Sequence, residues 1–200
     1  MLTYQRDPVE RGFKSRCESI SLGLRDDLGL PRTAPLPPDR LAEHLAIPIV
    51  SLEDVPGVEE DDAHQLLVVD PDSWSAITVS VAGREAIIIN PRHRGGRPAV
   101  DIAHEVAHLL LGHEPSLMSF VGDQDLAIRG YDRAAEEEAD WLAGAILLPR
   151  EALVHIARSR MDLASVLQTY CVSEALYTYR VNITGVNVQF RRGRSRTATR

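Results

Sequence analysis

The chain has little of what marks a secreted or membrane protein. Its only cysteines, Cys17 and Cys171, lie far apart in the sequence and form no Cys-x-x-Cys pair. A disulfide framework is therefore not expected, and the reducing cytoplasm is the predicted location. No stretch approaches the roughly 18 consecutive apolar residues of a membrane span. Residues 1–16 carry scattered charges without the apolar segment of a signal peptide.

Positive charge is scarce and unevenly placed. The formal net charge is −7, yet residues 191–200 hold five arginines and no acid, so the remainder of the chain carries −12. Nucleic-acid binding relies on clustered positive charge, so the body of the chain is not expected to bind DNA or RNA. We predict that residues 191–200 form a disordered tail. A contact between this tail and nucleic acid or another anionic partner is the less favoured alternative.

The apolar pattern predicts an α+β fold in which a small antiparallel sheet precedes a run of helices. A helix over residues 8–28 would place Cys17 on its buried face, and a short helix over 39–46 is expected to start at Asp39 as its cap. Further predicted elements are strands at 47–52 and 64–70, an acidic surface loop at 53–62, a hairpin formed by 76–81 and 85–90, and helices from 98 to about 183.

The segment DIAHEVAHLLLGH, residues 101–113, carries two histidines four positions apart on a predicted helix. A proline before the helix and a glycine near its end suit the helix boundaries. At 100° per residue, His108 lies about 40° around the helix from His104, and Glu105 lies about 100° from it. The three side chains therefore share one sector. The alternative interpretation is a core helix whose buried histidines bind nothing.

This arrangement has the chemistry of a zinc site. Two imidazole nitrogens on adjacent turns can bind one Zn²⁺ and leave coordination positions open, and Mn²⁺ is an alternative because it tolerates carboxylate ligands. Glu105 would not be a ligand. It would take a proton from the attacking water and pass it to a leaving amine. A catalytic zinc usually has three protein ligands, so the motif requires one more.

Two residues are candidates for the third ligand. His113 follows the glycine that ends the helix and is less favoured. Glu136 is favoured because it shares one face of a predicted helix with small residues that allow another helix to approach. Asp140 lies one turn later on this face, where it could orient a ligating histidine, whereas Glu137 and Glu138 are expected to point to solvent. The alternative is a solvated acidic patch that the helix dipole favours.

The chain resembles the ImmA/IrrE family of bacterial zinc metallopeptidases. The motifs that carry the resemblance are IIINP, AHEVAHLLLGH, EEEADWLAGAILLP and, further on, CVSEALYTYRVNITGV. The resemblance extends over about residues 40–186. It implies a zincin-like site between two helices, with His104, His108 and Glu136 as metal ligands and Glu105 as catalytic base.

The resemblance also implies a function. Family members cleave helix-turn-helix repressors, so we expect a zinc-dependent endopeptidase whose substrate is such a repressor encoded nearby. Its cleavage would derepress stress, phage or mobile-element genes. The alternatives are a non-catalytic module that binds a regulator and a DNA-binding protein. Residues 85–90 are expected to form an edge strand that pairs with an extended substrate peptide.

The resemblance leads to a division of the chain into four parts. They are an N-terminal helix with a proline-rich connection (1–38), a metallopeptidase core (39–150), a helical module of the same domain (151–190) and the tail (191–200). The helical module reads as helix-turn-helix, with Asp162 and Ser173 as caps. Its second helix holds one arginine, so packing or partner docking is favoured over DNA reading. The residues predicted to supply its core are Leu163, Val166, Leu167, Val172, Leu176 and Val181.

The remaining polar residues receive less specific assignments. Asp101 is predicted to cap the metal helix in preference to supporting a metal ligand, and His44, His64 and His93 are interpreted as surface or loop histidines. A zinc peptidase also needs a donor for the oxyanion. The sequence does not choose among Tyr131, His155, Tyr170, Tyr177, Tyr179 and Arg180.

Overall fold

The computed structural model describes residues 11–81, 83–113, 126–128 and 132–186. Within these ranges the helices are α1 (Phe13–Asp27), α2 (Pro38–His44), α3 (Glu60–His64), α4 (Arg97–Leu111), α5 (Arg133–Leu147), α6 (Arg150–Ser159), α7 (Leu163–Tyr170) and α8 (Glu174–Thr184). The strands are β1 (Ile49–Ser51), β2 (Ala76–Val81), β3 (Arg84–Ile89) and β4 (Leu126–Ile128). A 3-10 turn, η1 (Leu52–Asp54), and a π-helical turn, η2 (Gln65–Val69), complete the described elements. The α+β class is thus confirmed.

The sheet is mixed, with the strand order β1-β3-β2-β4. The predicted hairpin is present, because β2 pairs antiparallel with β3, and β4 is antiparallel to β2. The prediction of a fully antiparallel sheet is wrong, because β1 runs parallel to β3. After β1 the chain passes through η1, α3 and η2 before it enters β2, and this long crossover allows the parallel pairing. Strand β3 therefore has neighbours on both sides, so the predicted substrate pairing at residues 85–90 is also wrong.

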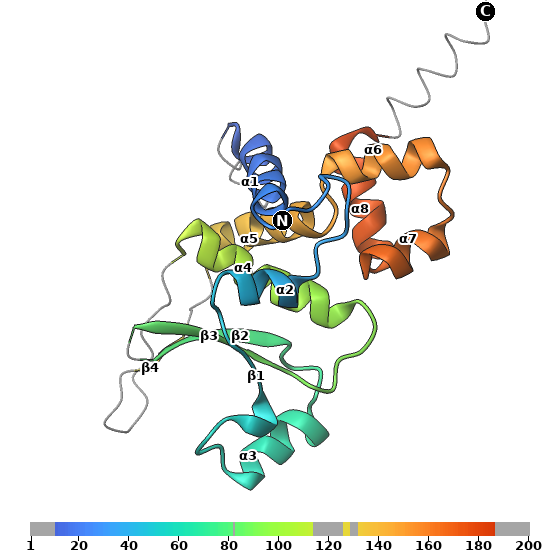
Figure 1. Ribbon diagram of the computed structural model, residues 1–200. Coiled ribbons are helices and arrows are strands. Elements are labelled where there is room, and N and C mark those ends of the chain that lie inside the picture. The colour runs from blue at the N-terminus through green and yellow to red at the C-terminus, as the bar shows by residue number, and fades with distance from the viewer. Residues whose placement is uncertain (1–10, 82, 114–125, 129–131, 187–200) are drawn as a thin grey trace, which may run out of the picture.

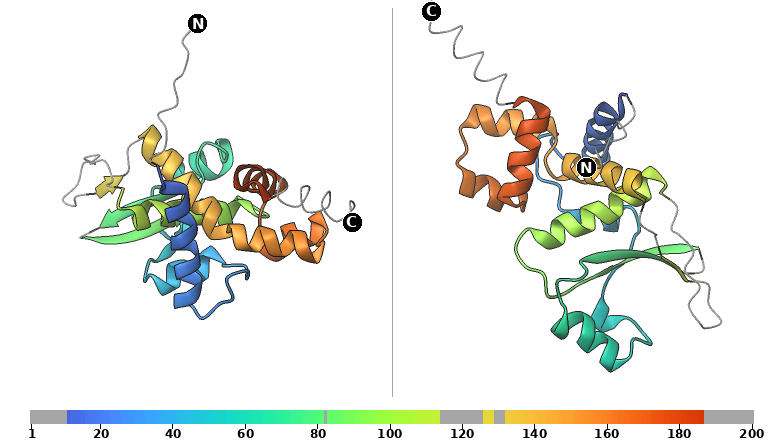
Figure 2. Two further views of the ribbon diagram at one scale, coloured as in Figure 1. Left: turned by 90° about the horizontal axis from the view of Figure 1, so that it is seen from above. Right: turned by 180° about the vertical axis from the view of Figure 1, so that it is seen from behind.

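Except for α3, which lies below the sheet, the helices lie above one face of it (Figure 1). Helix α4 packs on β2 and β3, α5 packs on α4, and α1 packs on α5. Buried alanines on both central helices allow their backbones to approach closely; they are Ala103, Ala107, Ala139 and Ala143. The views from above and from behind show α6, α7 and α8 grouped at one side of this stack (Figure 2). Helix α5 is therefore enclosed between the metal-motif helix and the N-terminal helix.

Polar side chains of distant helices bind the C-terminal carbonyls of α5. The last carbonyls of a helix have no partner within the helix. Here Ser21 donates to the Ala145 carbonyl over 2.6 Å, and the guanidinium of Arg25 donates to the Ile146 carbonyl over 2.8 Å. Burial lowers the pKa of Arg25 to about 10. These contacts fix α1 against the helix that carries Glu136.

In the N-terminal half, the two predicted helices are present, whereas a predicted helix cap and a predicted strand are not. Helix α1 buries Cys17 completely, as predicted. The short helix after the prolines is confirmed, but the capping role of Asp39 is wrong, because the helix starts at Pro38 and Asp39 lies in its first turn. The strand predicted at 64–70 is wrong as well. These residues continue α3 as the turn η2, in which Val68 and Val69 are exposed.

The C-terminal helices α7 and α8 are joined by a short turn. The caps predicted for them are confirmed: Asp162 accepts a hydrogen bond from the backbone N–H of Ser165, and Ser173 accepts one from Leu176. Val166, Val172 and Val181 are buried in the core, whereas the prediction that Leu163 is buried is wrong. Residues 191–200 lie outside the described residues. No helix in the described part of the chain is both long enough and apolar enough to cross a membrane.

Candidate metal centre

Helix α4 presents the histidine motif because its ends are defined on both sides. Pro98 occupies the first turn, where its missing N–H costs nothing. Gly112 ends the helix in the left-handed conformation, with φ of 71°, which a residue without Cβ adopts without strain. Between these ends His108 is buried and His104 is half-buried. Both boundaries predicted from the sequence are thus present.

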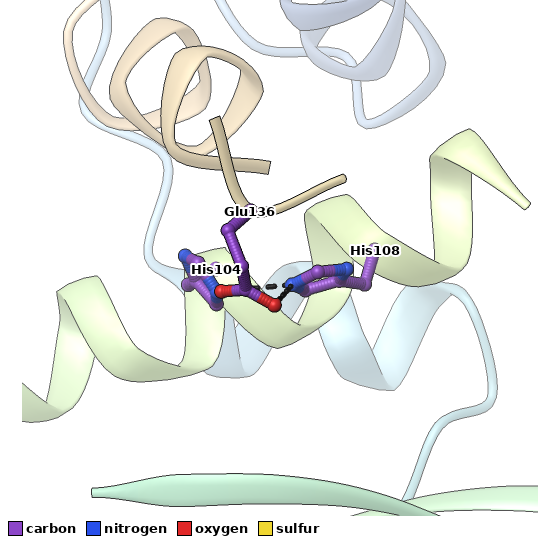
Figure 3. A group of neighbouring side chains, drawn as sticks. All are labelled: His104, His108 and Glu136. Atoms are coloured by element: carbon purple, nitrogen blue, oxygen red, sulfur yellow. Dashed lines mark hydrogen bonds and ion pairs between the residues drawn. The ribbon is translucent and has the colours of Figure 1, made fainter. Parts of the chain in front are cut away.

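Glu136 comes from the first turn of α5. That helix begins after Asp132, whose side chain accepts a hydrogen bond from the backbone N–H of Ala134 over 2.9 Å. The resulting helix axis directs Glu136 toward α4, between the two histidine rings (Figure 3). The structure therefore brings together three side chains from helices that are more than twenty residues apart in the sequence.

The donor groups of these side chains, which are two Nε2 atoms and the Glu136 carboxylate with its two oxygens, form a compact triangle. The Nε2 atoms of His104 and His108 lie 3.0 Å apart. Glu136 places Oε2 at 3.1 Å from Nε2 of His104 and Oε1 at 3.3 Å from Nε2 of His108. Tetrahedral zinc, with bonds of about 2.0–2.1 Å to nitrogen and oxygen, separates its ligand atoms by about 3.3 Å. Two imidazoles and one carboxylate at these separations fit one such ion.

Each imidazole is also held through its other nitrogen. Nδ1 of His104 lies 3.0 Å from Oδ1 of Asp140, which is the contact that the sequence led us to expect of Asp140. Burial lowers the pKa of His104, but the hydrogen bond to Asp140 and the charges of Asp140, Glu105 and Glu136 outweigh it, so the pKa is raised. A proton on this ring would therefore compete with a metal ion.

His113 lies beside the triangle and is not one of its corners. Its Nδ1 atom is 2.9 Å from Nδ1 of His108, and its Nε2 atom is 3.2 Å from Oε2 of Glu138. The group of potential metal ligands found in the described residues contains His104, His108 and Glu136. The prediction that Glu138 points to solvent is wrong, because His113 attracts its carboxylate back toward α4.

Glu105 points toward the sheet. Its Oε2 atom accepts hydrogen bonds from the backbone N–H of Thr78 over 2.9 Å and from the Thr78 hydroxyl over 2.6 Å. Thr78 is buried on β2. Sequence reasoning missed this residue, because only the packing of α4 on β2 brings it to the motif. The contact holds one carboxylate oxygen of Glu105 in place.

One assignment near the start of α4 is confirmed in part and another is wrong. His93 lies in the loop before α4, as predicted, but it is buried, and its Nδ1 atom lies 3.1 Å from Oδ2 of Asp101. Asp101 therefore does not cap α4. It binds His93 in the loop that leads into the helix. The loop glycine Gly96 is also enclosed, since a Cβ there would lie 2.9 Å from the Cys171 carbonyl.

Two of the candidates for the oxyanion donor have other hydrogen-bond partners in the structure. Arg180 is fully buried and donates to the Leu148 carbonyl, and the Tyr170 hydroxyl donates to the Thr33 carbonyl. Neither is directed at the triangle. Tyr179 is 42% exposed and lines a cavity that His104 also lines. Tyr131 lies outside the described residues, and neither His155 nor Tyr177 lines this cavity, so Tyr179 is the best-placed candidate in the described chain.

That cavity has a volume of about 440 Å³, and His104 is the member of the triangle that lines it. Helices α4 and α5 contribute His104, Asp140 and Gly144, and α8 contributes Leu176 and Tyr179. Most of its lining is aliphatic. Helix α8 thus forms one wall of a cavity next to His104.

The fold and these side chains define a class of protein: an α+β domain that holds two histidines and a carboxylate around a position for one metal ion, with a glutamate next to the first histidine. The profile of the IrrE N-terminal-like domain family, peptidase M78, matches residues 59–182, and the chain belongs to that family. It is a metallopeptidase family. The family resemblance seen in the sequence is thereby confirmed. No curated protein and no solved structure gives a significant match to the chain.

Proposed function

We propose that the protein is a zinc-dependent endopeptidase in which His104, His108 and Glu136 bind the metal and Glu105 is the catalytic base. The observation that supports the proposal most directly is the triangle of donor atoms, with separations of 3.0 to 3.3 Å, next to a glutamate held by the sheet. Zinc is the default metal for two histidines and a carboxylate, and Mn²⁺ is the alternative.

The residues would divide the work of peptide hydrolysis as follows. A bound zinc ion supplies Lewis acidity, which acidifies water and polarises a carbonyl. Glu105 takes the proton from the attacking water and gives it to the leaving amine. Thr78 keeps the carboxylate oriented during both transfers, since it binds Oε2 with two donors. Tyr179 is the proposed hydrogen-bond donor to the developing oxyanion.

We propose a protein substrate of the helix-turn-helix repressor class, on the strength of the family resemblance. The cavity between α4, α5 and α8 would accept an apolar side chain next to the scissile bond, because its walls are mainly aliphatic. The protein would act in the cytoplasm, where cleavage of the repressor would release its target genes.

The decisive experiment uses Glu105→Gln in the full chain. The amide keeps the size of the carboxylate and its bonds to Thr78 but cannot accept a proton from water. We expect wild-type zinc content and a loss of cleavage of about 10²–10⁴-fold against the repressor encoded beside the gene. Full cleavage by this variant would overturn the assignment of Glu105.

A second pair of variants tests the third ligand. Glu136→Ala is expected to lower zinc content sharply, because only two protein ligands remain. Glu137→Ala removes the same charge from the next position, where the side chain pairs with Arg133, and it is expected to leave zinc content unchanged. Equal loss of zinc in both variants would refute the choice of Glu136.

One other function deserves a test in the same assay. A regulator-binding module would bind the repressor through α8 without cleaving it. Helix α8 supports binding of a partner better than reading of DNA, because its single arginine, Arg180, is buried. If the Glu105→Gln protein still inactivates the repressor at one-to-one stoichiometry, without cleavage products, the binding module replaces the peptidase as the conclusion.

A further inference from the structure

We propose that His113 and Glu138 are positioning residues for His108. Together they would hold the proton of His108 on Nδ1, so that Nε2 carries the lone pair needed by a metal. The inference rests on the proposed metal site but not on peptide cleavage. It assigns a role to two residues that the resemblance and the histidine motif leave unexplained.

When His108 binds a metal through Nε2, the hydrogen bonds must run from His108 to His113 and from His113 to Glu138. A neutral imidazole has one donor nitrogen and one acceptor nitrogen. Nε2 of His108 faces Glu136 and His104, so metal binding requires the proton on Nδ1. Nδ1 of His113, at 2.9 Å, must then accept that proton's hydrogen bond. Its own proton lies on Nε2.

Glu138 completes the chain at its outer end. Nε2 of His113 lies 3.2 Å from Oε2 of Glu138, and an ionised carboxylate can only accept a hydrogen bond. The carboxylate therefore favours the His113 tautomer that leaves Nδ1 free to accept. The inner pair is shielded from water, because the side chain of His108 is 2% exposed and that of His113 is 13% exposed, whereas the Glu138 side chain at the outer end is 32% exposed. Shielded contacts of this kind hold a tautomer more firmly than solvated ones.

The end of α4 is built to bring His113 into place. Gly112 adopts the left-handed conformation, and the backbone N–H of His113 donates to the His108 carbonyl over 3.1 Å. This bond turns the chain back so that the His113 ring lies against the His108 ring, with ring centres 5.0 Å apart. A side chain one residue beyond a straight helix end would point elsewhere.

The two ligating histidines are thus supported by the same helix in two ways. Asp140 of α5 binds Nδ1 of His104 directly, and Glu138 of α5 acts on His108 through His113. Partners of this type fix ring orientation and raise ligand basicity, and their loss weakens metal binding by about 10–100-fold. Helix α5 therefore contributes a ligand and the supports of both other ligands.

The test measures zinc affinity of the full chain by competition with a chromophoric chelator. His113→Ala and Glu138→Ala are expected to weaken zinc binding about 10–100-fold. His113→Asn places an amide oxygen near the former Nδ1 position, where it can accept from His108, and we expect it to restore most of the affinity. Glu137→Ala is the matched control, because it removes an equal charge from the adjacent position, and it should change affinity less than twofold.

A spectroscopic measurement separates positioning from general destabilisation. In the metal-free Glu136→Ala protein, which lacks the carboxylate that competes for a proton at Nε2, ¹⁵N shifts of the His108 ring should report a proton on Nδ1, both alone and combined with His113→Asn, and a mixture of tautomers when combined with His113→Ala. Unchanged tautomer and affinity in His113→Ala would overturn the inference, as would equal weakening in His113→Asn and His113→Ala. Because neither readout needs a substrate, an inactive wild-type protein would refute the proposed function and leave this result intact.

Discussion

Replacement of Arg180 by methionine is expected to lower the free energy of unfolding by about 3 kcal/mol. The guanidinium is fully buried on α8, where Nε donates to the Leu148 carbonyl over 3.0 Å and Nη2 pairs with Glu18 of α1. Glu18 also accepts a hydrogen bond from the backbone N–H of Arg150 over 2.8 Å. The arginine therefore joins α8 to α1 and to the end of α5.

The magnitude follows from what the substitution leaves behind. The Leu148 carbonyl would lose its side-chain donor inside the protein, which costs about 1–2 kcal/mol. The Glu18 carboxylate is 24% exposed and keeps its bond to Arg150, so its loss of a partner costs about 1–2 kcal/mol, less than for a fully buried charge. Methionine fills the space of the arginine stem, so no large cavity term is added. For a chain of this size the melting temperature should fall by about 6–12 °C.

The assay is urea unfolding followed by circular dichroism, with Arg158→Met on the exposed surface of α6 as the control. We expect the control to lie within about 0.5 kcal/mol of the wild type. Equal stability of the two variants would refute the conclusion that the buried contacts of Arg180 stabilise the fold. If Arg180 instead served a DNA-reading helix, Arg180→Met would weaken DNA binding with an altered salt dependence and leave unfolding unchanged.

Three further predictions can be tested on purified protein. Cys17 is buried, and burial raises its pKa to about 11, so a thiol reagent at pH 8 should titrate only the exposed Cys171 in the native state and both thiols in denaturant. The pKa of His104 is raised in the folded, metal-free protein. Protonated His104 therefore stabilises the fold at pH values below its unfolded pKa of about 6.5, and this stabilisation is lost as the pH rises through the folded pKa. Asp140→Asn should remove most of this pH dependence. Thr78→Val should retain zinc but lower kcat by about tenfold, since Glu105 loses the hydroxyl donor and keeps the backbone donor.

Local signals in the sequence were sufficient for the elements that carry the site. The spacing of apolar residues predicted α4 and α5, and the boundary residues Pro98 and Gly112 marked the ends of α4 correctly. The requirement for a third ligand led to Glu136, since small residues on its helix face indicated a close helix neighbour. These features succeed because helical periodicity and helix ends depend on residues only a few positions apart.

Contacts between distant segments were where sequence reasoning failed. Thr78, His93 and Arg25 gave no local sign of their partners, and Arg180 was a candidate for the oxyanion donor although it is fully buried. The parallel pairing of β1 was missed because residues 64–70 of the crossover, which include the turn η2, were predicted as a strand from their apolar side chains. Glu138 was assigned to solvent because its position on the helix was considered without the histidine that follows α4.

The sequence by itself determined the helix that carries His104, Glu105 and His108, the face of α5 that carries Glu136, and the family to which the chain belongs. The tertiary structure decided which side chains meet: the triangle of His104, His108 and Glu136, the support of Glu105 by β2, and the contact of His113 with His108. The physical reason is the sequence separation of the residues involved. Backbone conformation follows from near neighbours, whereas these contacts join residues of separate elements and require α4 to pack on α5 and on β2.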